Sequence, residues 1–253
     1  MFAHERHIAI SELIERKQRI TVGALQKALR ISSATLRRDL AEMEKDGKVV
    51  RVHGGVVHPQ SLRAEPSFMR KSHESMEAKR AIAQAACDLV PDGASVLLDS
   101  GTTCLEIGRQ LLDRGGLTLI TNSVPLLHEA SITGMPILAT GGELRALSGA
   151  LTGMVALEWL EHLQADWAFL GASGIDDCAI ATTELSEAAI KRQFLRRARH
   201  CVLAADGTKW NATAPVRFAE WRDIECWLTS DALSKEDAKP LERAGLKIVR
   251  CKS

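Results

Sequence analysis

The stretch Ser32–Leu40, SSATLRRDL, decides the fold of the amino-terminal part of the chain. A serine at its start can cap a helix, because the hydroxyl accepts a hydrogen bond from a free backbone N–H of the first turn. Leu36, Leu40 and Met43 recur at helical spacing and predict one buried stripe. The hydroxyl and arginine side chains fall off this stripe. We expect them to face outward, where such groups can meet phosphates and base edges in a DNA major groove.

The residues before this stretch predict two more helices. Apolar residues at near-helical spacing indicate a helix over 3–17, and Thr21 can cap a second helix over 22–29. A three-residue turn leads to the third helix, 33–46, which stops at Gly47, a residue suited to a left-handed helix end. Helix, short helix, tight turn and helix in this order are typical of a helix-turn-helix.

A hairpin is expected next. Residues 48–59, KVVRVHGGVVHP, contain two β-rich runs separated by His-Gly-Gly, with glycines where a tight turn needs positive φ. Behind a recognition helix such a hairpin is a wing, and Arg51 and His53 would lie where it can touch the DNA backbone or minor groove. The alternative is an ordinary small helical domain with solvated charges. The candidate DNA-binding residues are Thr21, Ser32, Ser33, Thr35, Arg37, Arg38, Arg51, His53, Gly54 and Gly55.

The distribution of charge favours an amino-terminal domain, the head (residues 1–58), that contacts phosphate groups. The 253 residues carry a net charge of +1 and are 45% hydrophobic, which suits one large domain or a small and a medium one. Residues 1–58 hold eleven Lys and Arg against seven Asp and Glu, a net of +4, so the other 195 residues sum to −3. A basic head on a mildly acidic body is typical of a nucleic-acid contact.

The cysteines and histidines indicate neither a metal site nor a cofactor. The six cysteines are scattered without a CxxC pair and are expected to be reduced core residues. The eight histidines form no clear cluster with acids or cysteines. No secretory signal or long apolar run is present, so we expect a soluble cytoplasmic protein with no membrane partner.

Residues 59–75 are predicted to be a linker, because they lack periodicity and contain a proline among charges and serines. Phe68 and Met69 within them are apolar. They either dock on a neighbouring domain or subunit or are mere surface contacts. The chain is therefore expected to divide into a winged helix-turn-helix domain, 1–58, a linker, 59–75, and a larger domain, 76–253.

The larger domain alternates between strand and helix patterns. The predicted strands are 94–99, 117–121, 136–139, 167–171, 200–205, 226–229 and 246–249. The predicted helices are 76–89, 103–113, 124–132, 150–163, 184–199 and 235–244. This alternation predicts an α/β fold with a mostly parallel sheet that helices cover on both faces.

Polar turns follow five of these strands at their carboxyl ends, where such sheets bind ligands. The first turn, 99–103, DSGTT, opens a helix whose free N–H groups and dipole suit a phosphate. One such turn alone is more often only a turn, whereas five at one edge favour a small-molecule site. The candidate ligand-binding residues are Asp99, Ser100, Gly101, Thr102, Thr103, Thr121, Asn122, Ser123, Gly141, Gly142, Glu143, Gly171, Ser173, Asp176, Glu184, Lys191, Asp206 and Lys209.

The charges among these candidates have alternative explanations. Lys191 and Lys209 could neutralise a phosphate, and the carboxylates could hold sugar hydroxyls. Acids are favoured at any helix start, so Glu184 and Glu187 could simply be solvated there. Lys191 could also pair with Glu187 at i, i+4 on one helix.

Residues 32–55, SSATLRRDLAEMEKDGKVVRVHGG, resemble the amino-terminal signature of the DeoR family of bacterial transcriptional regulators. The segments DSGTT, TNS, GGEL, FLGASGID, EAAIK and AADGTK resemble the carboxyl-terminal effector domain of the same family. The resemblance implies a winged helix whose residues Ser33, Thr35, Arg37 and Arg38 face DNA. It also implies an effector domain with the fold of ribose-5-phosphate isomerase and glucosamine-6-phosphate deaminase.

A sugar-phosphate ligand is implied by the same resemblance, held by residues 99–103 with Lys209 nearby. Two positions depart from the family pattern. Gly207 stands where the family often has a serine, so that hydroxyl donor is missing. Residues 178–180, Cys-Ala-Ile, occupy a stretch that the family usually makes glycine-rich.

The leading expectation is a repressor of a sugar or polyol catabolic operon. Its partners would be operator DNA, a phosphorylated sugar that controls operator binding, and a second copy of itself in a dimer or tetramer. The rival is a sugar-phosphate isomerase or deaminase with a DNA-binding head, but no base is singled out at a defined distance from a second group. A third interpretation is an interaction module with a vestigial pocket. We expect that the protein is not an enzyme.

Overall fold

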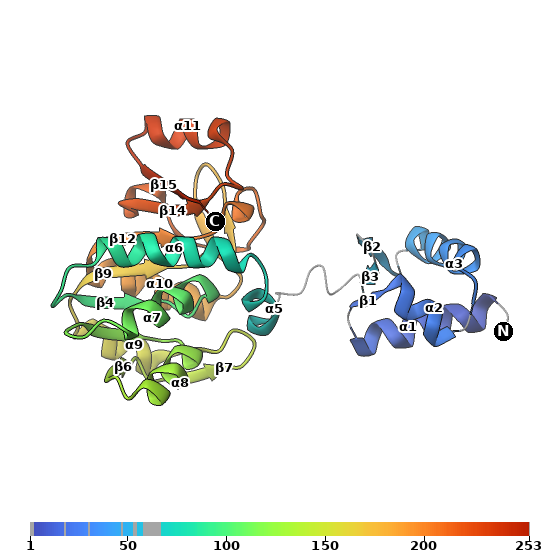
Figure 1. Cartoon of the computed structure of the whole chain (residues 1–253), viewed down its shortest axis with the longest axis horizontal. Helices are drawn as coiled ribbons and strands as arrows, with labels where there is room; N and C mark the ends of the chain where they lie inside the picture. Colours follow the sequence, from blue (N-terminus) through green and yellow to red (C-terminus); the bar gives the residue numbers. More distant parts are fainter. Residues whose placement is uncertain are drawn as a thin grey trace. The chain divides into compact units, whose positions relative to one another are not determined.

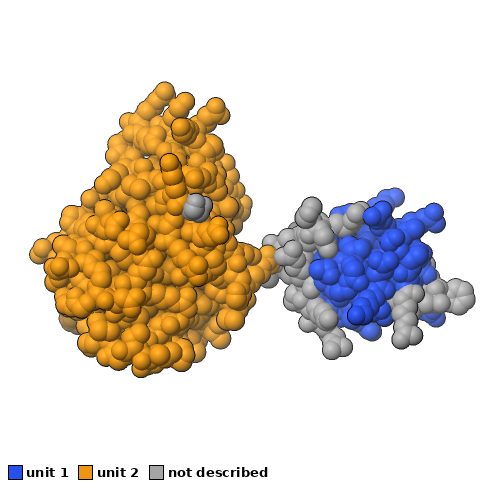
Figure 2. Space-filling view, in the orientation of Figure 1, with its two compact units in different colours: residues 1–66 blue, residues 67–253 orange. Residues whose placement is uncertain are grey.

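The computed structural model describes residues 3–17, 19–29, 31–46, 48–52, 55–57 and 67–252. It separates into two compact units, Met1–Pro66 and Ser67–Ser253 (Figures 1 and 2). Among the described residues, no helix combines the length and apolar character that crossing a membrane requires.

The described part of the first unit combines helices with a small antiparallel sheet (Figure 1). Its elements are α1 (Ala3–Lys17), β1 (Arg19–Thr21), α2 (Val22–Leu29), α3 (Ser33–Lys45), β2 (Val50–Val52) and β3 (Gly55–Val57). β3 pairs antiparallel with both β1 and β2. The predicted helices and hairpin are confirmed. β1 was not predicted, because three residues are too few for a strand periodicity to show.

Apolar residues from all three of these helices form the core of the first unit. Leu36, Leu40 and Met43 are at most 1% exposed, which confirms the stripe that their spacing predicted. Gly55 lets β3 approach β1, since a Cβ there would lie 2.6 Å from the carbonyl oxygen of Ile20. Its φ is not positive, so the prediction of positive φ is wrong for this glycine.

The second unit is built on a seven-stranded parallel sheet, in the order β15-β14-β12-β9-β4-β5-β6. The strands are β4 (Ser95–Leu98), β5 (Thr118–Thr121), β6 (Ile137–Ala139), β9 (Ala165–Leu170), β12 (Ala198–Ala204), β14 (Cys226–Ser230) and β15 (Lys247–Cys251). All seven predicted strands and their parallel arrangement are confirmed. The strands after β4 first extend the sheet in one direction and then, from β9, in the other.

Helices cover the two faces of this sheet (Figure 1). They are α5 (Phe68–Ser72), α6 (Met76–Leu89), α7 (Thr102–Leu112), α8 (Val124–Thr133), α9 (Met154–Glu161), α10 (Leu185–Arg197) and α11 (Lys235–Arg243). Alternate strand residues enter two separate cores. Val96 and Leu98 share one core with α6, α7 and α8. Leu97 shares the other with α9, α10 and α11.

The predicted helix over 150–163 is wrong in its first part. The residues Ala150–Thr152 form β8, which pairs with β7 (Glu143–Arg145), and α9 begins only at Met154. Gly153 separates strand from helix at φ +91°, a conformation that other residues rarely adopt. An unpredicted antiparallel sheet, β10 (Gly174–Ile175), β11 (Ile180–Thr182) and β13 (Val216–Ala219), and two short 3₁₀ helices, η1 (Gly207–Lys209) and η2 (Trp221–Asp223), complete the unit.

Part of the predicted linker belongs to the second unit. The Ser67 hydroxyl caps α5 by accepting a hydrogen bond from the N–H of Arg70 at 3.4 Å. The N–H of Phe68 donates to the carbonyl of Leu147 at 2.9 Å, and the Phe68 ring packs against a core of the domain. Met69 is 67% exposed, so only one of the two apolar linker residues docks.

Candidate functional sites

The start of α3 presents the predicted hydroxyls and arginines of the head. The Ser32 hydroxyl caps α3 by accepting from the N–H of Thr35 at 3.2 Å, and the two hydroxyl oxygens lie 2.8 Å apart. Ser33, Arg37 and Arg38 are exposed, whereas Thr35 is half-buried. The structure therefore gives Ser32 a capping role and leaves three of its neighbours available to a partner.

A buried ion pair that was not predicted fixes α3 against α1. Asp39 is 4% exposed, and its two carboxylate oxygens accept from Arg6 Nε at 2.7 Å and Arg6 Nη2 at 2.8 Å. The guanidinium of Arg6 lowers the pKa of the Asp39 carboxyl. Its place between Leu36 and Leu40, on the buried stripe, is the signal by which Asp39 could have been found.

The remaining candidates of the head have mixed outcomes. The Thr21 hydroxyl accepts from the N–H of Ala24 at 3.2 Å, which is the predicted cap of α2. Arg51 belongs to β2. His53 and Gly54 lie outside the described residues. Gly55 serves the contact between β1 and β3 described above.

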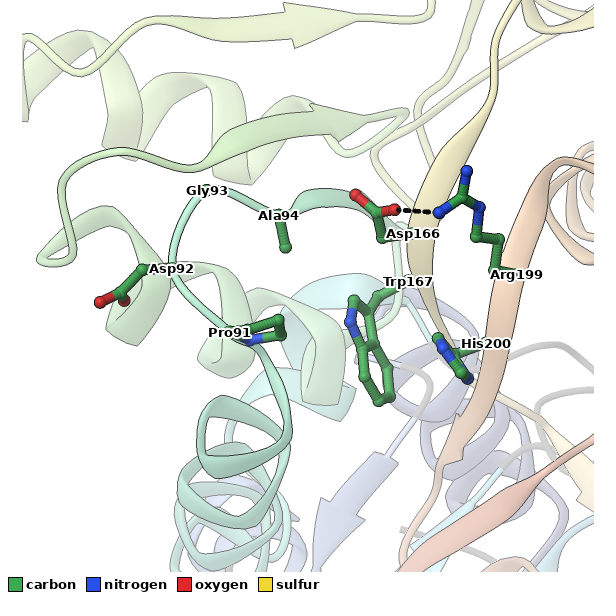
Figure 3. A pocket seen from close by; sticks show the side chains of 8 residues that line it. All are labelled: Pro91, Asp92, Gly93, Ala94, Asp166, Trp167, Arg199 and His200. Atoms are coloured by element: carbon green, nitrogen blue, oxygen red, sulfur yellow. Dashed lines mark ion pairs between the residues drawn. The ribbon is translucent and has the colours of Figure 1, made fainter.

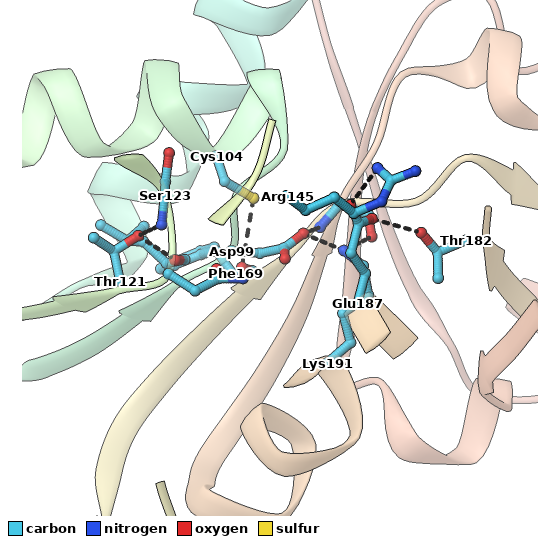
Figure 4. A network of polar contacts seen from close by, with 12 residues as sticks. Asp99, Cys104, Thr121, Ser123, Arg145, Phe169, Thr182, Glu187 and Lys191 are labelled. Atoms are coloured by element: carbon cyan, nitrogen blue, oxygen red, sulfur yellow. Dashed lines mark hydrogen bonds and ion pairs between the residues drawn. The ribbon is translucent and has the colours of Figure 1, made fainter. Parts of the chain in front are cut away.

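In the larger domain, β4 and β9 lie side by side where the strand order reverses. Such a switch point is where open parallel sheets bind ligands, at the carboxyl ends of the strands. Asp99 follows β4 and Gly171 follows β9. The Asp99 carboxylate accepts from the Gly171 N–H at 2.9 Å, and Lys191 Nζ of α10 donates both to this carboxylate and to the Gly171 carbonyl (Figure 4).

This Asp99–Lys191 pair is a brace that joins two strand ends and a helix. Asp99 is 1% exposed and Lys191 4%, so the two opposite charges neutralise each other inside the domain. Lys191 pairs with Asp99 and not with Glu187, so the alternative of an i, i+4 ion pair within α10 does not hold. Gly101 and Gly171 approach each other closely here, since a Cβ on either would lie 3.7 Å from the Cα of the other.

The turn after β4 leads directly into α7. Gly101 is the N-cap residue, and the first turn of the helix contains Thr102 and Thr103. Ser100 and Thr103 are buried, and Gly101 and Thr102 are half-buried. The first-turn N–H groups of a helix have no partner within the helix, so this turn offers donors at the switch point.

The turn after β5 uses most of its polar groups internally. The Thr121 hydroxyl donates to the Leu98 carbonyl at 2.6 Å and accepts from the Ser123 N–H at 3.0 Å (Figure 4). The Ser123 hydroxyl caps α8. Asn122 Nδ2 donates to the Leu151 carbonyl at 3.3 Å, but its Oδ1 is buried without a partner. Asn122 is thus the residue of this turn that still offers a polar atom.

A second buried network, one turn before Lys191 on α10, was not predicted. Glu187 is 7% exposed and accepts from Arg145 Nη1 at 3.0 Å and from the Thr182 hydroxyl at 3.3 Å (Figure 4). The alternative that Glu187 is a solvated acid at a helix start therefore does not hold. Glu184 does act at the helix start, as the N-cap of α10, where its carboxylate accepts from the Leu185 N–H at 3.1 Å.

The other predicted turn residues have local structural roles. Asp176 accepts from the N–H groups of Cys178 and Ala179 at 2.9 and 2.7 Å, and the Ser173 N–H donates to the Ala181 carbonyl. Asp206 caps η1 through the Thr208 N–H at 2.7 Å. Lys209, the last residue of η1, is half-buried. Gly141 and Gly142 take φ of +68° and +101° before Glu143, which is exposed at the start of β7.

Comparison with known proteins agrees with both units. The family model described as the DeoR C terminal sensor domain matches residues 74–231, and that of the DeoR-like helix-turn-helix domain matches residues 6–61. The chain belongs to the DeoR family. DeoR-family proteins are transcriptional regulators, so the expectation of a regulator is confirmed and the enzyme alternative is not favoured.

Two relatives in the DeoR family illustrate the match. The HTH-type transcriptional regulator GlpR of Haloferax volcanii is 33% identical over 250 residues, covering 98% of each chain. The glycerol-3-phosphate regulon repressor of Escherichia coli K12 is 30% identical over 216 residues, covering 85% of each. Among solved structures, ribose 5-phosphate isomerase A of Methanocaldococcus jannaschii matches at 19% identity and a TM-score of 0.41, over 54% of this chain and 55% of that one.

The two departures from the DeoR-family pattern have structural explanations. At Gly207, a Cβ would lie 2.2 Å from the backbone nitrogen of Leu233, so this chain has no room for the serine. Residues 178 and 179 lie between β10 and β11, where Cys178 is exposed, and Ile180 is the buried first residue of β11. The prediction of six buried cysteines is therefore wrong for Cys178, although all six are free thiols.

A cavity of about 320 Å³ lies at the amino ends of the parallel strands, at the sheet edge opposite the candidate ligand site (Figure 3). Trp167 stacks on His200 there with 4.5 Å between ring centroids, and Asp166 accepts from the N–H and hydroxyl of Ser95. Arg199 forms an ion pair with Asp166 at 3.5 Å. None of the predicted ligand-binding residues lines this cavity.

Proposed function

We propose that the chain is a repressor whose operator binding is controlled by a phosphorylated sugar or polyol. The observation that carries the proposal is the open amino end of α7 at the switch point, beside a neutral Asp99–Lys191 brace. A phosphate suits free helix N–H groups. The relative named glycerol-3-phosphate regulon repressor supports a phosphate ester as the effector.

In this proposal the site residues have different tasks. Ser100, Gly101, Thr102 and Thr103 would bind the phosphate, with Lys209 supplying a positive charge. The unpartnered Oδ1 of Asn122 would accept from a sugar hydroxyl. The remaining candidates would position the loops through the contacts described above.

We further propose that residues 1–58 hold the winged helix-turn-helix and that residues 76–253 hold the effector-binding part of the second unit. Arg37, Arg38 and Ser33 on the exposed side of α3 would read the major groove. Self-association of the chain as a dimer or tetramer in the cytoplasm would place two heads on an operator with matching symmetry.

The test is a thermal-shift screen of phosphorylated sugars and polyols on the wild type and two variants. Thr103→Ala should weaken the shift of the best compound, because the variant removes a hydroxyl from the first turn of α7. Thr118→Ala, on an exposed threonine at the start of β5, is the matched control and should leave the shift unchanged. No shift across the panel, or an unaltered shift in Thr103→Ala, would contradict the proposed site.

A further inference from the structure

Lys79 is a buried cation that is not among the candidate ligand-binding residues. It lies in the first turn of α6 and is 6% exposed. Its ammonium donates to the backbone carbonyl of Lys71, near the end of α5. Among the described residues, no carboxylate lies within 4.0 Å of the ammonium, which leaves two of its three N–H groups without a partner. Lysine is almost never buried without pairing.

The surroundings of Lys79 hold a second lysine. Burial lowers the pKa of Lys79, and the positive charge of Lys209 lowers it further, so the two ammonium groups repel each other. A like charge nearby disfavours the charged form of a lysine. Lys209 is one of the residues proposed for the phosphate, and α6, which carries Lys79, packs against both α7 and β12, the strand that precedes Lys209.

The carboxylates near Lys79 have partners of their own. Glu74, Glu106 and Asp206 act on its pKa in the opposite direction, and none of them pairs directly with it. Glu106 accepts from Arg109 at 2.6 Å, Asp206 accepts from the Thr208 N–H at 2.7 Å, and Glu74 accepts from Arg70 at 3.2 Å. Glu106 belongs to α7, the helix that packs against α6 and whose amino end is proposed to receive the phosphate.

We propose that Lys79 is a second lysine of the anion site and that it ties this site to α5. The inference rests on the proposed function. An anionic oxygen held between Lys79, Lys209 and the start of α7 would engage the free N–H groups of Lys79. The same ammonium would keep its bond to the Lys71 carbonyl, because it has three donors. Binding of the anion would therefore order α5, the first element after the residues that lead from the head.

The experiment uses the full chain and inorganic phosphate, compared with chloride at equal ionic strength. Lys79→Met removes the charge and keeps an apolar stem, Lys79→Arg keeps the charge, and Lys239→Met on the exposed side of α11 is the matched control. Phosphate should raise the melting temperature of the wild type, the control and Lys79→Arg. In Lys79→Met the apparent phosphate affinity should fall about 10-fold or more, the scale of a charge-assisted hydrogen bond.

Two further measurements separate a lost ligand contact from a lost fold. Without phosphate, Lys79→Met should still unfold in one cooperative transition, although it loses a buried charge together with the hydrogen bond to the Lys71 carbonyl. Hydrogen exchange of the α5 amides should slow on addition of phosphate in the wild type but not in Lys79→Met. Both results support the proposal.

The outcomes distinguish the two proposals. If phosphate stabilises the wild type and Lys79→Met equally, with unchanged exchange in α5, the role of Lys79 is overturned and the proposed function stands. If neither phosphate nor any phosphorylated sugar of the screen acts on the wild type, both proposals are overturned.

Discussion

At the scale of single residues, buried charges separate what the sequence predicts from what it hides. Asp99 and Lys191 were both predicted for the site, but sequence patterns give no sign that they pair with each other across 92 positions. Glu187, for which a solvated helix start was one alternative, and Asp39, which was not among the candidates, are buried in ion pairs. Their partners, Arg145 and Arg6, come from distant segments, so only the folded chain brings the charges together.

Asp39→Asn should destabilise the head by about 1–3 kcal/mol, because it removes the charge that accepts two hydrogen bonds from Arg6. Asp46→Asn is the matched control at the C-cap of the same helix, since that carboxylate is 48% exposed. Chemical denaturation of the full chain, followed by a probe in the head, measures both. Equal stability of the two variants would contradict a structural role for the Arg6–Asp39 pair.

The same pair predicts how the stability of the head depends on pH. Arg6 lowers the pKa of Asp39 in the folded state. The stabilisation is therefore fully present above the ordinary carboxyl pKa of about 4 and is lost as the pH falls through the lowered value. The acid limb of a stability profile should flatten in Asp39→Asn, and an unchanged limb would argue against this assignment.

Cys178 should be the one thiol of the folded chain that reacts rapidly with a thiol reagent. It is exposed, whereas the other five cysteines are buried, and burial raises the pKa of Cys87, Cys201 and Cys251 to about 11. Asp177 raises the pKa of Cys178 as well, so its reaction should accelerate as the pH rises above 9. Counting fast-reacting thiols in the wild type and in Cys178→Ser checks this, and a fast phase that persists in the variant would contradict it.

At the scale of elements, periodicity predicted the seven parallel strands, whose apolar residues alternate between two cores, and most helices, whose apolar residues face one core. Several short strands were not predicted from the sequence: β1, β7, β8 and β10 have two or three residues each. The helix predicted over 150–163 failed because the positive φ of Gly153 is a property of the folded turn. The polar turns of the site were predictable as a group, since parallel strands bring their carboxyl ends to one edge.

Gly207→Ser tests the packing of η1 against the segment before α11. A side chain at this position meets the backbone of Ala232 and Leu233, so we expect a loss of about 2 kcal/mol or more. Gly115→Ser is the matched control, because nothing lies within 4 Å of a Cβ there. Thermal unfolding of the two variants gives the comparison, and equal melting temperatures would show that η1 can move to accept the serine.

At the scale of the whole molecule, the proposed function needs a DNA-binding unit and a ligand-sensing unit in one chain. A ligand can change operator affinity only if it binds two states of the protein with different affinity. A coupling of about 1–3 kcal/mol corresponds to a change of about 5- to 150-fold in DNA affinity. Neither unit suffices alone, since the arginines of α3 and the polar turns of the sheet belong to different units.

The most direct measurement is the affinity of the full chain for a DNA site selected from a random pool, with and without the best phosphorylated compound of the screen. We expect a change within that range, which Thr103→Ala should reduce. Arg37→Ala should abolish site-specific binding and leave the thermal shift by the compound intact. A compound that binds the chain and leaves DNA affinity unchanged would contradict the control of operator binding by a phosphorylated sugar or polyol.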